Sequence, residues 1–140
     1  MPLTYHPNIG TIVICDYQGF ISPEMIKRRP AIVISPRFRK RNNLCTVVPL
    51  STTPPDPPMP YHYKLVVDPP LPKPYDSPVM WVKADMFATV SFSRLFIPQK
   101  GKLNNGKRDY DVRIIEEFDL KKIQECVLHA IGLPHLTGHI

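Results

Sequence analysis

Basic side chains are concentrated in one stretch of this sequence of 140 residues. Seven of its 18 lysines and arginines lie between residues 27 and 41, and no acidic residue occurs from 25 to 55. A local excess of positive charge attracts phosphate groups. For Arg37–Arg41, this interpretation and that of a merely solvated loop both stay open. Lys27–Arg29 differ, because Pro30 joins them to an apolar segment, and the end of a rigid strand can hold a guanidinium in place.

The histidines and cysteines form no known catalytic or metal-binding pattern. The five histidines are scattered, and the three cysteines lie far apart without a CxxC pair. We therefore expect no metal site and no complete disulfide framework. The sequence has no GxSxG, GxGxxG or GxxxxGK[ST] segment, which argues against a serine hydrolase elbow, a nucleotide-binding loop and a cofactor. His62, between Tyr61 and Tyr63, could stack on a base or pack against the fold.

Short β-branched segments, separated by polar or proline-containing connections, make up most of the chain. We expect strands at residues 10–16, 29–35, 44–50, 61–67 and 79–86, and a further short strand within 91–97. Eleven of the 18 prolines fall between residues 49 and 78. Because proline has no amide donor, we expect mainly loop in residues 54–78, the proline-rich insert. An Asn-Gly pair at 105–106 predicts a turn in a loop at 101–107.

One helix is predicted near the end of the sequence. Apolar residues recur there at helical spacing, namely Leu120, Ile123, Val127, Ala130 and Ile131. Asp119 fits the N-cap, Phe118 and Ile123 fit the flanking hydrophobic positions, and Gly132 fits the helix end. We expect a mainly β fold, a small and mostly antiparallel barrel with a C-terminal helix packed against it, in one domain spanning residues 1–140.

The composition points to a globular protein with an anionic partner. The formal net charge is +6, the pI is about 9.3, and 43% of the residues are hydrophobic. No apolar run approaches the roughly 18 residues of a spanning helix. The first twenty residues also lack the pattern of a secretory signal, so we expect a cytoplasmic location without membrane attachment.

Three segments, in this order, resemble the PemK/MazF family of type II toxin–antitoxin toxins. They are residues 23–35 (PEMIKRRPAIVIS), 46–53 (TVVPLSTT) and 81–86 (WVKADM), and the opening residues 8–16 resemble the first strand of the family. The resemblance implies a dimeric Src-homology-three-like barrel of the CcdB/PemK type. It also implies an endoribonuclease that cleaves single-stranded RNA without a metal, and a small acidic antitoxin that occupies the substrate groove.

The resemblance also implies catalytic residues. The Arg-Pro motif assigns Arg29 to stabilisation of the charge that develops on phosphorus, and the position after the next strand assigns Ser51 to a hydrogen bond with the scissile phosphate. Glu24 is the candidate general base or the group that orients Arg29. Two further interpretations stay open. Glu24 could form a salt bridge with Lys27–Arg29, and Ser51 could form a turn before the insert.

Six other residues are candidates for substrate binding. They are Lys27, Arg28, Thr52, His62, Lys83 and Asp85. Asp85 could instead make a structural hydrogen bond at a strand end. Two positions depart from the family pattern, because some relatives have a histidine at Pro23 and an arginine at Lys83. Since variable loops of the family border the RNA groove, we expect the proline-rich insert to shape base preference.

Two competing functions remain from the resemblance. The CcdB branch shares the fold and inhibits DNA gyrase by binding, without catalysis. A degenerate family member would only bind RNA. The presence of Arg29, Ser51 and Glu24 together favours RNA cleavage over both alternatives.

Overall fold

Strand β3 organises the sheet, because its two halves pair with different neighbours. The computed structural model describes residues 1–140. Its strands are β1 (Ile12–Asp16), β2 (Arg28–Val33), β3 (Leu44–Ser51), β4 (His62–Val66), β5 (Val79–Lys83), β6 (Ala88–Ser91), β7 (Leu95–Phe96), β8 (Gln99–Lys102) and β9 (Arg108–Tyr110). The helices are α1 (Glu117–Ala130) and three 3-10 turns at Ala84–Met86, Phe92–Arg94 and Pro134–His139. None of these helices has the length and apolar character that crossing a membrane requires.

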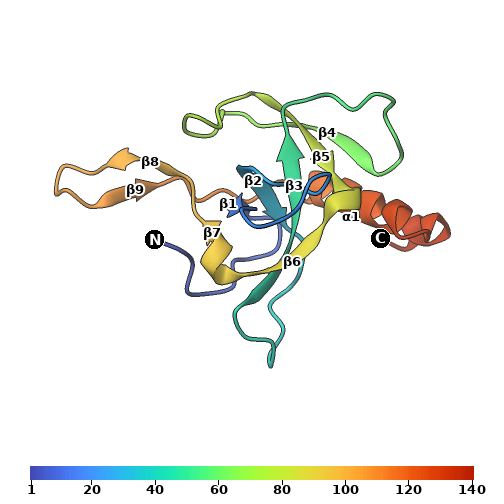
Figure 1. Ribbon diagram of the computed structural model, residues 1–140, viewed down its shortest axis with the longest axis horizontal. Helices are drawn as coiled ribbons and strands as arrows, with labels where there is room; N and C mark the ends of the chain where they lie inside the picture. The colour runs from blue at the N-terminus through green and yellow to red at the C-terminus, as the bar shows by residue number, and fades with distance from the viewer.

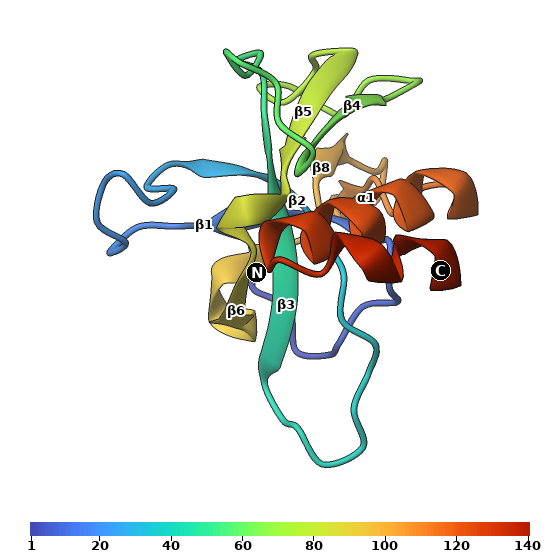
Figure 2. The same ribbon diagram turned by 90° about the vertical axis from the view of Figure 1, so that its right-hand side faces the viewer.

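Strands β1, β2, β3, β6 and β7 close into a small antiparallel barrel. β2 pairs with β1 and with the middle of β3, β6 pairs with the first half of β3, and β7 pairs with β1. The 3-10 turn Phe92–Arg94 carries the chain from β6 to β7, so the ring closes. The end of β3 pairs instead with β5, and β4 lies at the edge beyond it (Figure 1, Figure 2). The predicted mainly β fold with a C-terminal helix is confirmed.

Both faces of the central strands are buried, which explains why their sequences read as continuous apolar runs. Alternate residues of a strand point to opposite faces. Val33 of β2 lies in the core inside the barrel, and its neighbour Ile32 lies in a second core beneath α1. Ile123 of α1 and Leu71 of the proline-rich insert are buried in that second core. The helix and the insert are therefore both fastened to the outer face of the barrel.

Helix α1 begins earlier than predicted. Its first residue is Glu117, and the residue before it makes no capping hydrogen bond through its side chain. Asp119, predicted as the N-cap, lies in the first turn, where its Oδ1 accepts a 2.6 Å hydrogen bond from the hydroxyl of Tyr63. Phe118, predicted to pack at the helix start, is 65% exposed. A tertiary contact thus uses the carboxylate that the pattern assigned to the cap. The predicted end is confirmed, since Gly132 has a φ of +79°.

The segment after β5 also differs from the prediction. The strand expected at 79–86 ends at Lys83 and continues as a 3-10 turn. Strand β6 was not predicted, and the strand expected within 91–97 is mostly the turn Phe92–Arg94, followed by the two residues of β7. The chain changes direction every few residues here, so each run is too short to show a strand pattern.

Strands β8 and β9 form a hairpin that projects from the body of the molecule (Figure 1). Its tip holds the predicted Asn-Gly turn, where Gly106 has a φ of +84°. Of the loop predicted at 101–107, residues 101 and 102 belong to β8, and no prediction covered the other residues of the two strands. All of β8 and most of β9 are exposed. Without a buried face, the two strands have no alternation of apolar and polar residues that could reveal them.

Candidate active site

Arg29 lies near the start of β2 with its side chain half-buried. It is paired in register with Cys15 of β1, and its Nε atom is enclosed without a hydrogen-bond partner. Burial lowers the pKa of Arg29, and the neighbouring Tyr17 acts in the opposite direction. No carboxylate forms an ion pair with this guanidinium. A phosphate bound at the accessible part of the guanidinium would supply the missing negative charge.

Two neutral groups lie beside Arg29. Tyr17 is fully buried, and its hydroxyl has no hydrogen-bond partner. Burial raises the pKa of Tyr17 well above its usual value and raises the pKa of Cys15 to about 12. Both groups therefore stay protonated at neutral pH and leave the positive charge of Arg29 uncompensated. The sequence analysis missed Tyr17, because only the pairing of β1 with β2 brings it near Arg29.

Ser51 lies at the end of β3, on the same face as Arg29. Ala31 of β2 is paired with Pro49 of β3, the last pair of this register. Arg29 and Ser51 each lie two residues beyond that pair, so the alternation of strand faces puts both on one side of the sheet. The Ser51 side chain is buried, and its Oγ accepts a 3.2 Å hydrogen bond from the backbone N–H of Thr53. The hydroxyl thus forms the turn before the insert and still has its own proton to donate. The next residue, Thr52, is exposed.

Glu24 and Asp85 line one hollow of about 330 Å³ together with Tyr17. Glu24 is exposed in the loop between β1 and β2, where its Oε1 accepts a 2.7 Å hydrogen bond from the N–H of Ile21. It forms no ion pair with Lys27–Arg29. Tyr17 borders both this hollow and Arg29. The two predicted acidic residues, Glu24 and Asp85, therefore lie on the same side of the barrel as Arg29, with Tyr17 between the hollow and the guanidinium.

His62, Lys83 and Asp85 form a charged group where β4 begins and β5 ends. His62 is paired in register with Lys83. The pKa of His62 is lowered by burial and by Lys83, while Asp85 acts in the opposite direction. The His62 Nδ1 accepts a 3.0 Å hydrogen bond from the N–H of Met59, so the neutral ring carries its proton on Nε2. Asp85 is exposed and makes no ion pair, so its carboxylate faces solvent at the rim of the hollow.

Arg28 lies on the other side of the strand from Arg29. Its guanidinium covers the ring of Phe96 at 4.2 Å from the ring centroid and lines a different hollow. Lys27 is exposed in the loop before β2. The structure thus separates Arg28 from the group formed by Arg29, Ser51, Tyr17 and the hollow with Glu24. Nowhere in the chain do three histidine, cysteine, aspartate or glutamate side chains come together as metal ligands would.

The family model of PemK-like, MazF-like toxins of type II toxin–antitoxin systems matches residues 8–124. The chain belongs to this family. The match includes the whole barrel, the proline-rich insert and the first half of α1. It therefore confirms the resemblance found in the Arg-Pro motif and in the segments after β2.

Two relatives and two solved structures are similar to most of the chain. A Haemophilus influenzae protein of undescribed function is 29% identical over 94% of this chain and 94% of its own. The Escherichia coli protein YifN is 29% identical, with 68% of this chain and 75% of YifN covered. The crystal structure of MazF from Deinococcus radiodurans is similar with a TM-score of 0.63 at 18% identity, over 91% and 98% of the two chains. An endoribonuclease from Mycobacterial species has a TM-score of 0.55 at 21% identity, over 94% and 96%. These two structures establish the fold.

Proposed function

We propose that this toxin-family chain is a sequence-selective endoribonuclease that cleaves single-stranded RNA in the cytoplasm. The observation that carries the proposal is the half-buried guanidinium of Arg29, which has no carboxylate partner and lies on the same face of the sheet as the Ser51 hydroxyl. The pair offers a cation and a hydroxyl donor to one phosphate group. The description of a structural neighbour as an endoribonuclease supports the same activity.

The proposed reaction uses the RNA as its own nucleophile. The ribose 2′-oxygen attacks the neighbouring phosphorus, the bond from phosphorus to the 5′-oxygen breaks, and the products are a cyclic phosphate and a free 5′-hydroxyl. Glu24 takes the proton of the 2′-hydroxyl, and Arg29 and Ser51 bind the non-bridging oxygens as charge develops on them. The Arg29 guanidinium keeps its charge throughout, and the departing 5′-oxygen takes its proton from solvent water.

The test is cleavage of a long single-stranded RNA by the purified protein in EDTA, beside Arg29→Ala and Ser51→Ala. We expect discrete fragments from the wild type, and a rate lower by about a hundred- to a thousand-fold when the Arg29 side chain is removed. Equal cleavage by Arg29→Ala would contradict the assignment. No cleavage by the wild type on several RNAs would favour a binding-only function, and DNA gyrase would then be assayed.

The same proposal includes two partners, a small acidic antitoxin and a second copy of the chain. The chain has a net charge of +6, and its Arg29 has no carboxylate partner within the chain. Both features are complementary to an acidic segment. Light scattering of the purified chain, alone and with the product of a neighbouring acidic gene, measures both assemblies. A chain that stays monomeric would contradict the dimer.

A further inference from the structure

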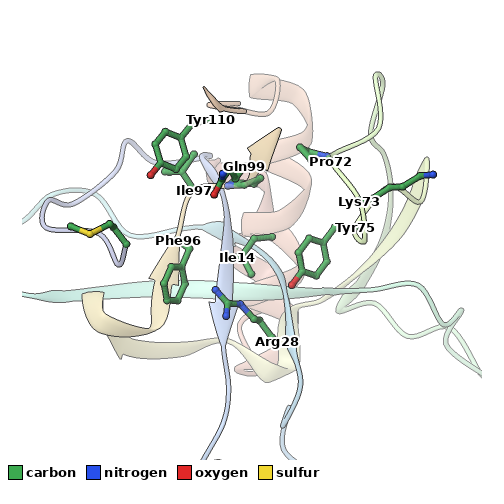
Figure 3. Close-up of a pocket in the computed structure, with 11 residues that line it drawn as sticks. Ile14, Arg28, Pro72, Lys73, Tyr75, Phe96, Ile97, Gln99 and Tyr110 are labelled. Carbon is green, nitrogen blue, oxygen red and sulfur yellow. The ribbon is translucent and has the colours of Figure 1, made fainter. Parts of the chain in front are cut away.

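A second hollow lies on the opposite face of β1 and β2 from Arg29 (Figure 3). Its volume is about 270 Å³, slightly below the range of about 300–1,000 Å³ that is usual for pockets that enclose a whole ligand. Ile14 is buried at its base. The walls come from distant parts of the chain, namely β2, β7, the proline-rich insert and the base of the hairpin. The wall residues that matter here are Arg28, Phe96, Tyr75, Gln99 and Tyr110.

Flat groups line this hollow. The Arg28 guanidinium lies over the Phe96 ring, and Figure 3 shows it between the rings of Phe96 and Tyr75. Arg28 has no carboxylate partner, so its charge and its outer face stay available. Unstacked nucleobases bind against aromatic rings and guanidinium planes of this kind. The side-chain N–H of Gln99 donates a hydrogen bond to the carbonyl of Gly101. Its side-chain oxygen remains free to accept a hydrogen bond from the edge of a base.

The neighbouring hairpin carries positive charge with little neutralisation. Residues 99–110 contain four basic side chains, Lys100, Lys102, Lys107 and Arg108, and one acidic side chain, Asp109. The one ion pair among them is long, 4.0 Å between Lys100 and Asp109. A two-stranded hairpin that pairs only with itself is marginally stable in water. A polyanion bound along this arm would offset both the mutual repulsion of its cations and its weak packing.

The aromatic hollow and the basic arm are continuous. A second depression of about 700 Å³ shares Pro72, Lys73 and Gln99 with the hollow, and adds Lys100 and Arg113. Arg113 is neutralised by Asp111 at 2.7 Å, whereas Lys73 has no acidic partner. Planar side chains beside the unpaired Lys73, with Lys102, Lys107 and Arg108 free on the hairpin, have the chemistry that a nucleotide requires, a base next to its phosphates.

We propose that this hollow binds one unstacked base of single-stranded RNA and that the β8–β9 hairpin holds the phosphates next to it. The choice of RNA rests on the proposed function. Because Arg28 and Arg29 are adjacent on β2 and face opposite sides, the bound base lies outside the cleaved linkage and selects among sequences. An acidic peptide would explain the cations of the hairpin but not the planar walls of the hollow.

The test is binding of a labelled, short single-stranded RNA with 2′-O-methyl groups, measured by fluorescence anisotropy at constant salt. The methyl groups block the nucleophile, so binding is measured whether or not the protein cleaves RNA. Arg28→Lys keeps the charge and loses the plane, and Tyr75→Leu removes an aromatic wall. We expect each variant to bind about ten-fold more weakly. Phe118→Leu is the matched control, because Phe118 is an exposed ring under Lys122 on α1 and lines neither the hollow nor the adjoining depression.

The variants separate the possible outcomes. Tyr75 also packs against the second core, so thermal unfolding of each variant is measured in parallel. If Tyr75→Leu is unstable, the affinity of Arg28→Lys alone tests the proposal, because the Arg28 side chain is exposed. Affinity equal to wild type in Arg28→Lys would overturn the proposal, as would an equal loss in Phe118→Leu. A parallel loss of binding to a poly-glutamate peptide would assign the surface to an acidic protein segment and would also overturn it. Absence of RNA cleavage contradicts the proposed function alone.

Discussion

The hydroxyl of Tyr17 is a polar group inside an apolar core. The residue is fully buried, and its hydroxyl has no hydrogen bond of standard geometry, with the weakly polar Cys15 thiol beside it. An unsatisfied buried polar group costs about 1–3 kcal/mol, so Tyr17→Phe should leave the free energy of unfolding unchanged or raise it by about 1 kcal/mol. Urea unfolding of the two proteins measures the difference. A variant less stable by more than about 1 kcal/mol would show that the hydroxyl has a partner and contributes to folding.

His62 makes stability depend on pH in a defined direction. Its pKa in the folded chain is lowered, first by burial and then by Lys83, so below its ordinary value of about 6.5 the unfolded chain binds more protons than the folded one. The contribution of His62 to the free energy of unfolding is therefore fully present above pH 6.5, and it is lost as the pH falls toward the pKa of His62 in the folded chain. His62→Gln, which keeps an acceptor for Met59, should show a smaller decline from pH 7 to 5. Parallel curves for both proteins in denaturant would contradict this origin.

Helix α1 contributes to stability through one face only. Ile123 is fully buried against the second core, whereas Ile131 at the helix end is 50% exposed. Ile123→Ala should reduce the free energy of unfolding by about 2–5 kcal/mol, because it removes buried methyl groups and leaves a cavity. Ile131→Ala makes the same chemical change at an exposed position and should cost less than about 1 kcal/mol. Equal losses in thermal unfolding would mean that the helix end is buried in solution, for example in a dimer.

Long elements with a buried face were predictable from the sequence, and short or fully exposed elements were not. The runs that became β2 and β3 were found because burial on both faces demands continuous apolar residues. The hairpin strands were missed because they are exposed, although the turn chemistry of Gly106 marked its tip. The start of α1 was misplaced because a hydrogen bond to Tyr63 recruited Asp119.

The candidate site divides in the same way. Arg29 and Ser51 follow from local motifs, and the alternation of β2 and β3 beyond their last pair puts both on one face of the sheet. Tyr17 and the separation of Arg28 from Arg29 depend on the pairing of β1 with β2 and on which face each side chain takes. No spacing within the sequence specifies that pairing.

At the scale of the whole molecule, the question is whether net charge or local charge governs binding to RNA. The chain carries a net +6, and any polyanion gains from that field. Lys100, Lys102 and Lys107 project on the hairpin, while Lys64, Lys121 and Lys122 lie on β4 and α1 at the other end (Figure 1). Replacing either set by glutamine removes the same three charges. The two triple variants thus have equal net charge and differ only in where it was lost.

Counterion release makes the comparison quantitative. Each phosphate neutralised on a single strand contributes about 0.7 to the slope of log affinity against log salt. If the hairpin lysines contact phosphates, their triple replacement should lower the slope by up to about 2, and the control triple should leave it nearly unchanged. Anisotropy titrations of the same 2′-O-methyl RNA over a salt series give the slopes. Equal reductions in both variants would mean that the RNA responds to the field of the whole molecule, and that the hairpin is not a phosphate-binding arm.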